Sequence, residues 1–122
     1  MAAIVVNFTA QRGRLLPWQA RKVCDFIAAA QDKAVSLAEL AELVGLSPFH
    51  FARAFRNTTG LPPHRYQIAL RIDKAKALLA TTDLSITEIA AQLGYDDPGY
   101  FARLFGREAG CTPREYRKNQ AY

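Results

Sequence analysis

The chain has 122 residues, of which half are hydrophobic, and this is enough for one compact domain or two very small ones. Its 16 Lys and Arg residues against 11 Asp and Glu residues give a net charge of +5, which is compatible with a polyanionic partner but common in unrelated proteins. Its two cysteines have no zinc-ligand spacing and no apolar run approaches membrane-spanning length, so a structural zinc site and a transmembrane protein are both disfavoured.

Residues 1–16 show no clear periodicity, and we interpret them as a linker or N-terminal extension that precedes a domain of residues 17–122. Pro17 suits the first position of a helix, and apolar residues then recur at i, i+3, i+4 and i+7. This spacing predicts an amphipathic helix that ends near Asp32. Trp18, at the start of this helix, is expected to cover the core of the first half of the chain.

A helix-turn-helix pattern follows. Ser36 and Glu39 have the spacing of a capping box, in which the serine oxygen accepts an early backbone N–H and the glutamate reaches back to the cap. Gly45 can end this helix in the left-handed conformation, and Ser47 with Pro48 can begin the next one. We therefore predict two short helices with a tight turn between them.

The same pattern then occurs a second time. Ser36-Leu-Ala-Glu-Leu-Ala-Glu-Leu-Val-Gly45 returns as Ser85-Ile-Thr-Glu-Ile-Ala-Ala-Gln-Leu-Gly94, and Phe51-Ala-Arg-Ala-Phe55 returns as Phe101-Ala-Arg-Leu-Phe105. Asp97 before Pro98 is the expected cap in the second copy, and Thr112-Pro113 opens a short last helix. The sequence predicts an all-α, homeodomain-like fold of seven helices, with helix-turn-helix units over about 36–60 and 85–110 and a linking helix over about 65–80.

The second helix of each copy has two faces that can be separated by counting. The inward stripes carry phenylalanines, and the outward stripes carry small residues and arginines: Phe49, Ala52, Arg53 and Arg56 in the first copy, and Gly99, Ala102, Arg103 and Gly106 in the second. A helix enters the DNA major groove only if its exposed side chains do not hold it away, and an arginine can then pair with guanine O6 and N7. This pattern predicts that both helices contact bases.

Other residues are candidates for contacts with phosphates. The first helix of each copy begins at Leu37 or Ile86, where free backbone N–H groups and the positive end of the helix dipole suit an anion. The basic candidates are Arg56, Arg71, Lys74 and Arg107, of which Arg71 and Lys74 are expected to face solvent or a partner from the linking helix.

The length of the linking helix suggests that both copies can bind one duplex. At 1.5 Å per residue this helix is about 24 Å long, which is compatible with the roughly 34 Å between successive major grooves on one face of DNA. If the linking helix is rigid, we expect binding either to bend the duplex or to leave one copy loosely engaged.

The residues from Ser36 to Phe55 resemble the first helix-turn-helix of the AraC/XylS family of bacterial transcription regulators, and residues 86–116 resemble the family signature. The matching residues of the second copy are Ala90, Gly94, Tyr95, Tyr100, Phe101, Arg103, Phe105, Gly110, Pro113 and Tyr116. The resemblance covers about residues 17–118, nearly the whole chain.

This resemblance implies a domain that binds double-stranded promoter DNA and contacts RNA polymerase, most often as an activator. Matching members place base contacts at the positions of Phe49, Ala52, Arg53, Pro98, Gly99, Tyr100 and Arg103. Ala52, Pro98 and Gly99 replace longer polar side chains of some members, so the second copy either reads bases mainly through Arg103 or chiefly holds the backbone.

The same resemblance bears on what lies beyond this domain. Many members carry a separate effector-binding or dimerisation domain, for which this chain has no room. The chain is then either the DNA-binding part of a longer regulator or a small regulator that acts alone. Both roles belong in the cytoplasm, in association with the nucleoid, and the low cysteine content fits a reducing compartment.

Two other classes of function remain as alternatives. A helical protein-interaction module without DNA contact would favour an aromatic cluster on the outward faces, where only Phe49 qualifies. An enzyme has little support, because no glycine-rich phosphate loop and no Ser/His/Asp arrangement occurs. We expect no cofactor and no metal.

Overall fold

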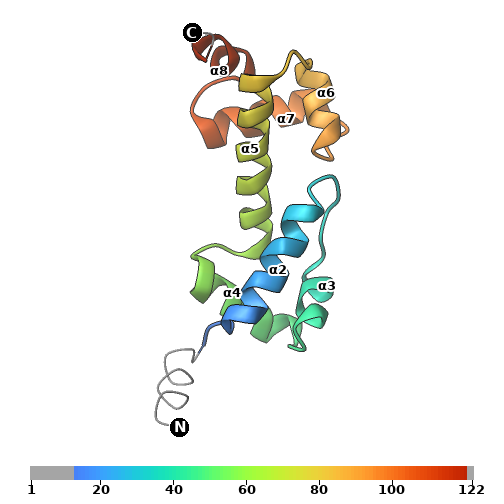
Figure 1. Ribbon diagram of the computed structural model, residues 1–122, viewed down its shortest axis with the longest axis vertical. Coiled ribbons are helices and arrows are strands. Elements are labelled where there is room, and N and C mark those ends of the chain that lie inside the picture. The colour runs from blue at the N-terminus through green and yellow to red at the C-terminus, as the bar shows by residue number, and fades with distance from the viewer. Residues whose placement is uncertain (1–12, 121–122) are drawn as a thin grey trace. The chain divides into compact units, whose positions relative to one another are not determined.

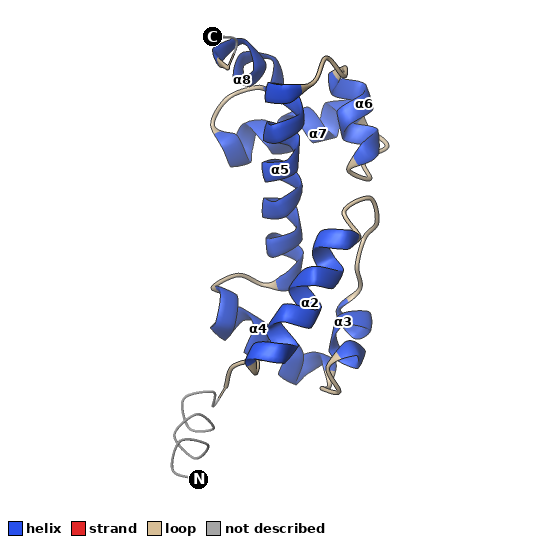
Figure 2. Ribbon diagram, in the orientation of Figure 1, coloured by secondary structure: helices blue, strands red, loops and turns tan. Residues whose placement is uncertain are grey.

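The computed structural model describes residues 13–120, and within this range every regular element is an α-helix (Figure 2). The predicted all-α fold of seven helices is therefore confirmed. The helices are α2 (Pro17–Ala29), α3 (Leu37–Leu43), α4 (Pro48–Thr59), α5 (Pro63–Thr81), α6 (Ile86–Gln92), α7 (Pro98–Ala109) and α8 (Pro113–Asn119), as labelled in Figure 1. No helix in the described range is both long enough and apolar enough to cross a membrane.

The helices belong to two compact units. Unit 1 holds the described residues up to Ala29 together with Val35–Tyr66, and unit 2 holds Ala30–Ala34 together with the chain from Gln67 onward. The linking helix α5 begins in unit 1 and continues through unit 2. Its 19 residues make it about 28 Å long, three residues longer than the predicted range of 65–80.

Unit 1 is built around two phenylalanines of α4. Phe51 and Phe55 are fully buried, with ring centroids 5.6 Å apart, and Tyr66 at the start of α5 packs edge-on against Phe55 at 5.3 Å. Helix α2 contributes Val23 and Ile27, both without exposed surface. Such buried side chains supply most of the stability of a small unit, because each contributes roughly 1.5–3 kcal/mol on leaving water.

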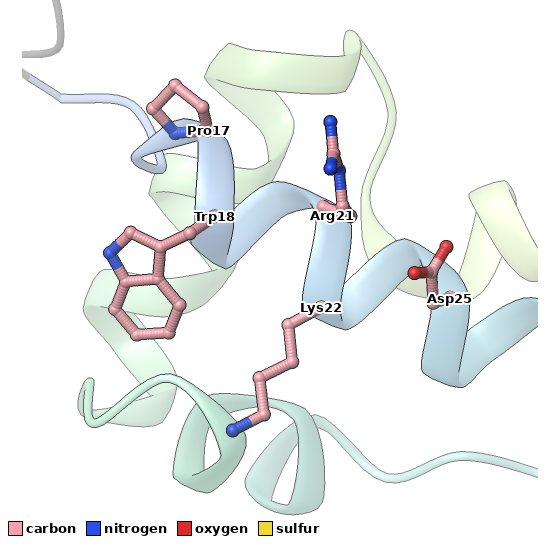
Figure 3. Close-up of a pocket in the computed structure, with 5 residues that line it drawn as sticks. All are labelled: Pro17, Trp18, Arg21, Lys22 and Asp25. Atoms are coloured by element: carbon pink, nitrogen blue, oxygen red, sulfur yellow. The ribbon is translucent and has the colours of Figure 1, made fainter.

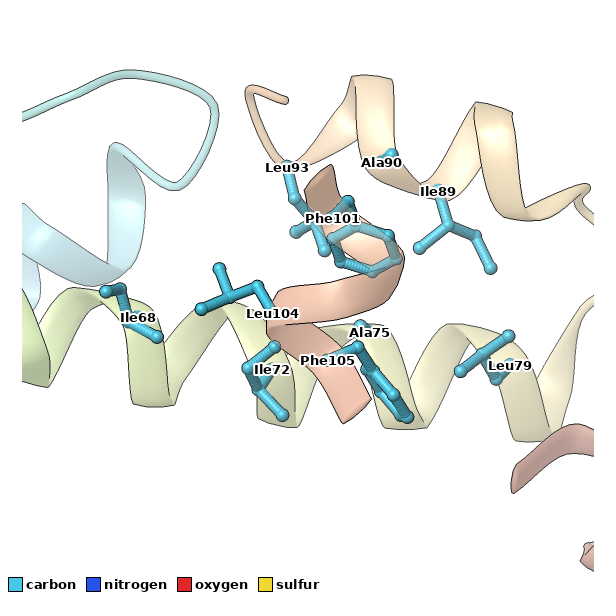
Figure 4. Packing of buried hydrophobic residues seen from close by; sticks show 10 residues of the cluster. All are labelled: Ile68, Ile72, Ala75, Leu79, Ile89, Ala90, Leu93, Phe101, Leu104 and Phe105. Carbon is cyan, nitrogen blue, oxygen red and sulfur yellow. The ribbon is translucent and has the colours of Figure 1, made fainter. Parts of the chain in front are cut away.

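Unit 2 repeats this core with its own phenylalanines. Phe101 and Phe105 of α7 are fully buried, and Tyr116 of α8 packs edge-on against Phe105 at 5.8 Å. Figure 4 shows the buried cluster, in which side chains of α5 and α6 close over those of α7. Its members are Ile68, Ile72, Ala75, Leu79, Ile89, Ala90, Leu93, Phe101, Leu104 and Phe105.

The capping residues fix where the short helices begin. Ser85 and Glu88 form the complete predicted capping box of α6. Thr112 and Glu115 form a second complete box at α8, which the sequence reading did not identify. At α3 the predicted box is only half made, because Glu39 accepts from the hydroxyl of Ser36 instead of from its backbone N–H.

The start of the described chain departs from two expectations. Trp18 is 54% exposed and does not cover the core, because the buried stripe of α2 runs through Gln19, Val23 and Ile27. Within the predicted linker, residues 13–16 pack on α4, with Leu15 only 2% exposed. The rest of that predicted linker, residues 1–12, lies outside the described residues.

Candidate nucleic-acid interface

Helix α4 presents the outward face that the sequence predicts. Ser47 caps it by accepting the backbone N–H of His50, and Pro48 occupies its first turn. This start turns Phe51 and Phe55 inward and leaves Phe49 72% exposed, with Arg53 exposed on the same side. The division into an inward and an outward face is confirmed, whereas base contact through that face stays a prediction.

The outward face of α4 borders a shallow hollow of unit 1. Its lining combines apolar surface with two guanidinium groups and contains no carboxylate: Leu37, Phe49, Ala52, Arg53, Arg56, Asn57 and Pro62. An apolar floor with cationic edges can contact both the base edges and the sugar-phosphate backbone of a nucleic acid.

Helix α7 presents the corresponding face in unit 2. The side chain of Asp97 accepts the backbone N–H groups of both Gly99 and Tyr100, which sets the direction of the first turn. Arg103 is exposed, and a Cβ added at Gly99 would lie 3.5 Å from its Nη1 atom. The guanidinium of Arg103 therefore lies beside Gly99, one turn toward the N-terminus of α7.

The remaining base-contact candidates of unit 2 differ in exposure. Tyr100 is 46% exposed, so Phe49 is not the only aromatic residue on the two outward faces. Pro98 is half-buried, as is Ala102. Arg103 and the hydroxyl of Tyr100 are therefore the exposed hydrogen-bonding groups among these candidates, since Pro98, Gly99 and Ala102 have no polar side-chain atom.

The candidates for phosphate contact from the first helix of each unit are unlike one another. Leu37 is 38% exposed, whereas Ile86 packs against the core of unit 2. The backbone N–H and the hydroxyl of Ser85 hold the pKa of Glu88 below its ordinary value of 4.5, so this carboxylate is ionised at neutral pH beside the N-terminus of α6. Its negative charge opposes a phosphate near Ile86, and Glu39 holds the corresponding position in the first turn of α3.

Three of the basic candidates are exposed, namely Arg56, Lys74 and Arg107. Arg71 is not, and the prediction that it faces solvent is wrong. Arg71 is 8% exposed, its Nε donates to the carbonyl of Gln31 at 2.9 Å and its Nη2 donates to that of Lys33 at 2.8 Å. Its guanidinium also lies 5.0 Å from the centre of the Tyr95 ring. Arg71 is thus a structural residue of unit 2, and we withdraw it from the phosphate contacts.

Two residues beside Arg53 were not predicted by the sequence. Arg14 and Asn57 line a second hollow along α4, together with Gly13, Gln19, Leu46, His50, Arg53 and Ala54. No periodicity places Arg14, because it precedes the first helix. Asn57 lies at i+4 from Arg53, so the two side chains are neighbours on one face of α4, and this spacing is the signal that could have identified it.

The exposed face of α2 has a different character. Its hollow is lined by Pro17, Trp18, Arg21, Lys22 and Asp25, so charges of both signs are mixed. Figure 3 shows the indole of Trp18 and the Lys22 chain on one side of the helix, with Arg21 pointing to the other. Within residues 13–120, no group of three His, Cys, Asp or Glu side chains could hold a metal ion.

Comparison with known proteins places this arrangement in a family. The sequence model of a helix-turn-helix domain matches residues 40–119. An uncharacterized HTH-type transcriptional regulator of Staphylococcus aureus (strain COL) is 38% identical over 96 residues, which are 79% of this chain and 13% of that protein. The HTH-type transcriptional activator RhaS of Enterobacter sp. (strain 638) is 41% identical over 70% of this chain and 31% of its own length.

The fold is similar to that of a DNA-binding domain whose crystal structure was solved in complex with DNA. The crystal structure of the DNA-binding domain of AdpA, a global transcriptional factor, in complex with a target DNA superimposes with a TM-score of 0.76. It shares 29% identity and covers 83% of this chain and 91% of its own. The chain thus spans less than a third of the two sequence relatives and nearly all of this DNA-binding domain.

Proposed function

Because the chain belongs to the AraC/XylS family of helix-turn-helix proteins, we propose that it binds double-stranded DNA at specific sites and regulates transcription. The observation that carries this proposal is the recurrence of one exposed arginine, Arg53 on α4 and Arg103 on α7, at the same place on two helices that each begin with a side-chain cap and a proline. Each helix enters a major groove, where its arginine pairs with a guanine.

The base contacts in this proposal come from both units. They are Phe49, Ala52 and Arg53 on α4, and Pro98, Gly99, Tyr100 and Arg103 on α7. Arg103 dominates the reading by unit 2, because its neighbours on the outward stripe are glycine or alanine. Unit 1 combines Arg53 with the exposed ring of Phe49, which suits the methyl group of thymine.

The phosphate contacts supply affinity without sequence preference. They are the backbone N–H groups at Leu37 and Ile86 and the side chains of Arg56, Lys74 and Arg107. Of these, Leu37 and Ile86 contribute least, because a carboxylate shares each helix end, Glu39 in α3 and Glu88 in α6.

The regulatory role rests on the relatives. RhaS is a transcriptional activator, and we extend activation and contact with RNA polymerase to this chain. Such a regulator works in the cytoplasm, on the nucleoid. The matched family is a helix-turn-helix domain, which is a DNA-binding class, and we propose no catalytic activity for the chain. A helical protein-interaction module is the alternative, and it requires that no duplex is bound.

The proposal is tested by Arg53→Ala on a duplex selected from random DNA. We expect a loss of roughly 1–3 kcal/mol in binding free energy and a relaxed preference at one base pair, since the bidentate contact is removed. Arg21→Ala is the matched control, because it removes the same charge from the exposed face of α2. Equal binding by Arg53→Ala, Arg21→Ala and wild type would refute the assignment of this face.

A further inference from the structure

Residues 13–16, which directly precede α2, are hydrogen-bonded to the helix that is proposed to read DNA. The Nδ2 atom of Asn57 on α4 donates to the carbonyl of Gly13 at 2.7 Å, and the backbone N–H of Leu15 donates to Oγ1 of Thr58 at 2.9 Å. The side chain of Leu15 is 2% exposed. Residues 13–16, which we call the strap, are therefore held on the C-terminal half of α4.

The start of α2 secures the other end of the strap. Oε1 of Gln19 accepts the backbone N–H of Leu16 at 2.8 Å, while Nε2 of Gln19 donates to the carbonyl of Val44 at 3.2 Å. Gln19 is 8% exposed, so these bonds are shielded from water. The backbone on both sides of Arg14 is thus fixed, whereas Arg14 itself is exposed.

The strap and α4 enclose a hollow of about 370 Å³ whose charge has one sign. Arg14 and Arg53 both line it, and no Asp or Glu side chain does. His50 and Asn57 add polar groups between them. A concave surface with two guanidinium groups and no carboxylate suits a polyanion, because arginine binds phosphate oxygens through paired N–H donors.

The place of this hollow on α4 indicates which polyanion fits. Arg53 and Asn57 line it and also line the hollow that contains Phe49 and Leu37, so the two hollows lie on either side of these residues. A major groove is about 12 Å wide and has a sugar-phosphate backbone along each edge. When α4 lies in the groove, one of these backbones runs past the strap.

Resting on the proposed function, we infer that the strap is an additional DNA-contact element: Arg14 binds a phosphate of the strand that flanks α4, and Asn57 is the positioning residue that holds the strap in place. The strap adds affinity for any sequence, because phosphates carry no base identity. It also restricts how α4 is oriented in its groove.

The test compares Arg14→Ala with Arg21→Ala on the selected duplex and on a random one. Log affinity falls linearly with log salt concentration, and loss of one phosphate contact makes this negative slope shallower by about 0.9. For Arg14→Ala we expect this shift on both duplexes, so that a fourfold rise in salt costs the variant about 3.5-fold less affinity than it costs wild type. Arg21→Ala is expected to keep the wild-type slope.

The contacted phosphate is located with a series of duplexes in which one phosphate at a time is replaced by an uncharged methylphosphonate. One position should weaken wild-type binding yet leave Arg14→Ala unaffected. Asn57→Ala should lower affinity alone but add nothing to Arg14→Ala, because the two changes remove the same contact. Additive losses would overturn the positioning role of Asn57.

Failure of this inference is distinct from failure of the proposed function. If Arg14→Ala keeps the wild-type slope while Arg53→Ala loses specific affinity, α4 reads DNA and the strap does not contact it. If wild type binds no duplex at all, the proposed function falls and the inference falls with it.

Discussion

Arg71 has a positive charge that suggests contact with phosphates, but its burial and hydrogen bonds indicate that it stabilises the fold. We expect Arg71→Ala to destabilise the protein and to leave the salt dependence of DNA binding unchanged. The variant loses two hydrogen bonds from a charged donor, to the carbonyls of Gln31 and Lys33, and the stacking of the guanidinium on Tyr95.

The magnitude follows from these contacts. Hydrogen bonds to charged groups contribute roughly 1.5–3 kcal/mol each, and a cation–π contact about 0.5–2 kcal/mol. Burying the guanidinium costs part of this gain. Gln67 donates to the carbonyl of Lys33 at 2.8 Å, and we expect this bond to keep that carbonyl satisfied when Arg71 is removed. The expected net loss in unfolding free energy is therefore about 2–4 kcal/mol, lower than the simple sum.

Urea unfolding measures the stability, and a salt titration of DNA binding measures the phosphate contacts. Lys74→Ala is the matched control, since it removes an exposed positive charge from the same helix. We expect Lys74→Ala to change stability by less than about 0.5 kcal/mol and to lower the salt slope by about one unit. The reverse result, with Arg71→Ala stable and its salt slope lowered, would refute the structural role of Arg71.

Two further changes test local features of the fold. Gly94→Ala should lower the unfolding free energy more than Gly60→Ala does. Both glycines have φ near +85°, but only at Gly94 would the new Cβ lie 2.7 Å from the carbonyl oxygen of Asp32. Equal losses of about 1–2 kcal/mol for the two variants in urea unfolding would contradict a role for this close approach. Glu115→Gln should destabilise the protein at neutral pH, because the Thr112 backbone N–H and hydroxyl lower the pKa of Glu115 below its ordinary value of 4.5. A carboxyl whose pKa is lowered in the folded state stabilises the fold at pH values above its ordinary pKa, and this stabilisation is lost as the pH falls. The difference in unfolding free energy between wild type and Glu115→Gln should therefore disappear in acid. A difference that does not change with pH would contradict capping by the charged carboxylate.

The helices and their faces could be predicted from sequence because the signals are local. Ser47 and Pro48 begin α4 where the sequence indicates, and the spacing of Phe51 and Phe55 identifies its buried face. Capping and helical periodicity depend on residues within one or two turns. The same local rules give the exposure of Arg53 and Arg103.

The errors arose where a residue's partner is distant in sequence. Arg71 is buried because the carbonyls that bind it come from residues 31 and 33, which no periodicity of α5 could reveal. The strap is packed because Asn57 and Thr58 bind it from the far end of α4. Trp18 is exposed because Gln19, its polar neighbour, takes the buried position through its bond to Val44.

The central claim is that α4 and α7 each read bases of one duplex. Selection of bound sites from random double-stranded DNA tests it most directly. We expect a site with two information-rich segments about one helical turn apart, roughly 10 base pairs centre to centre. Each segment should contain a preferred guanine, and this preference should be lost in Arg53→Ala for one segment and in Arg103→Ala for the other. A single short segment sensitive to only one arginine, or no enrichment of any sequence, would contradict it.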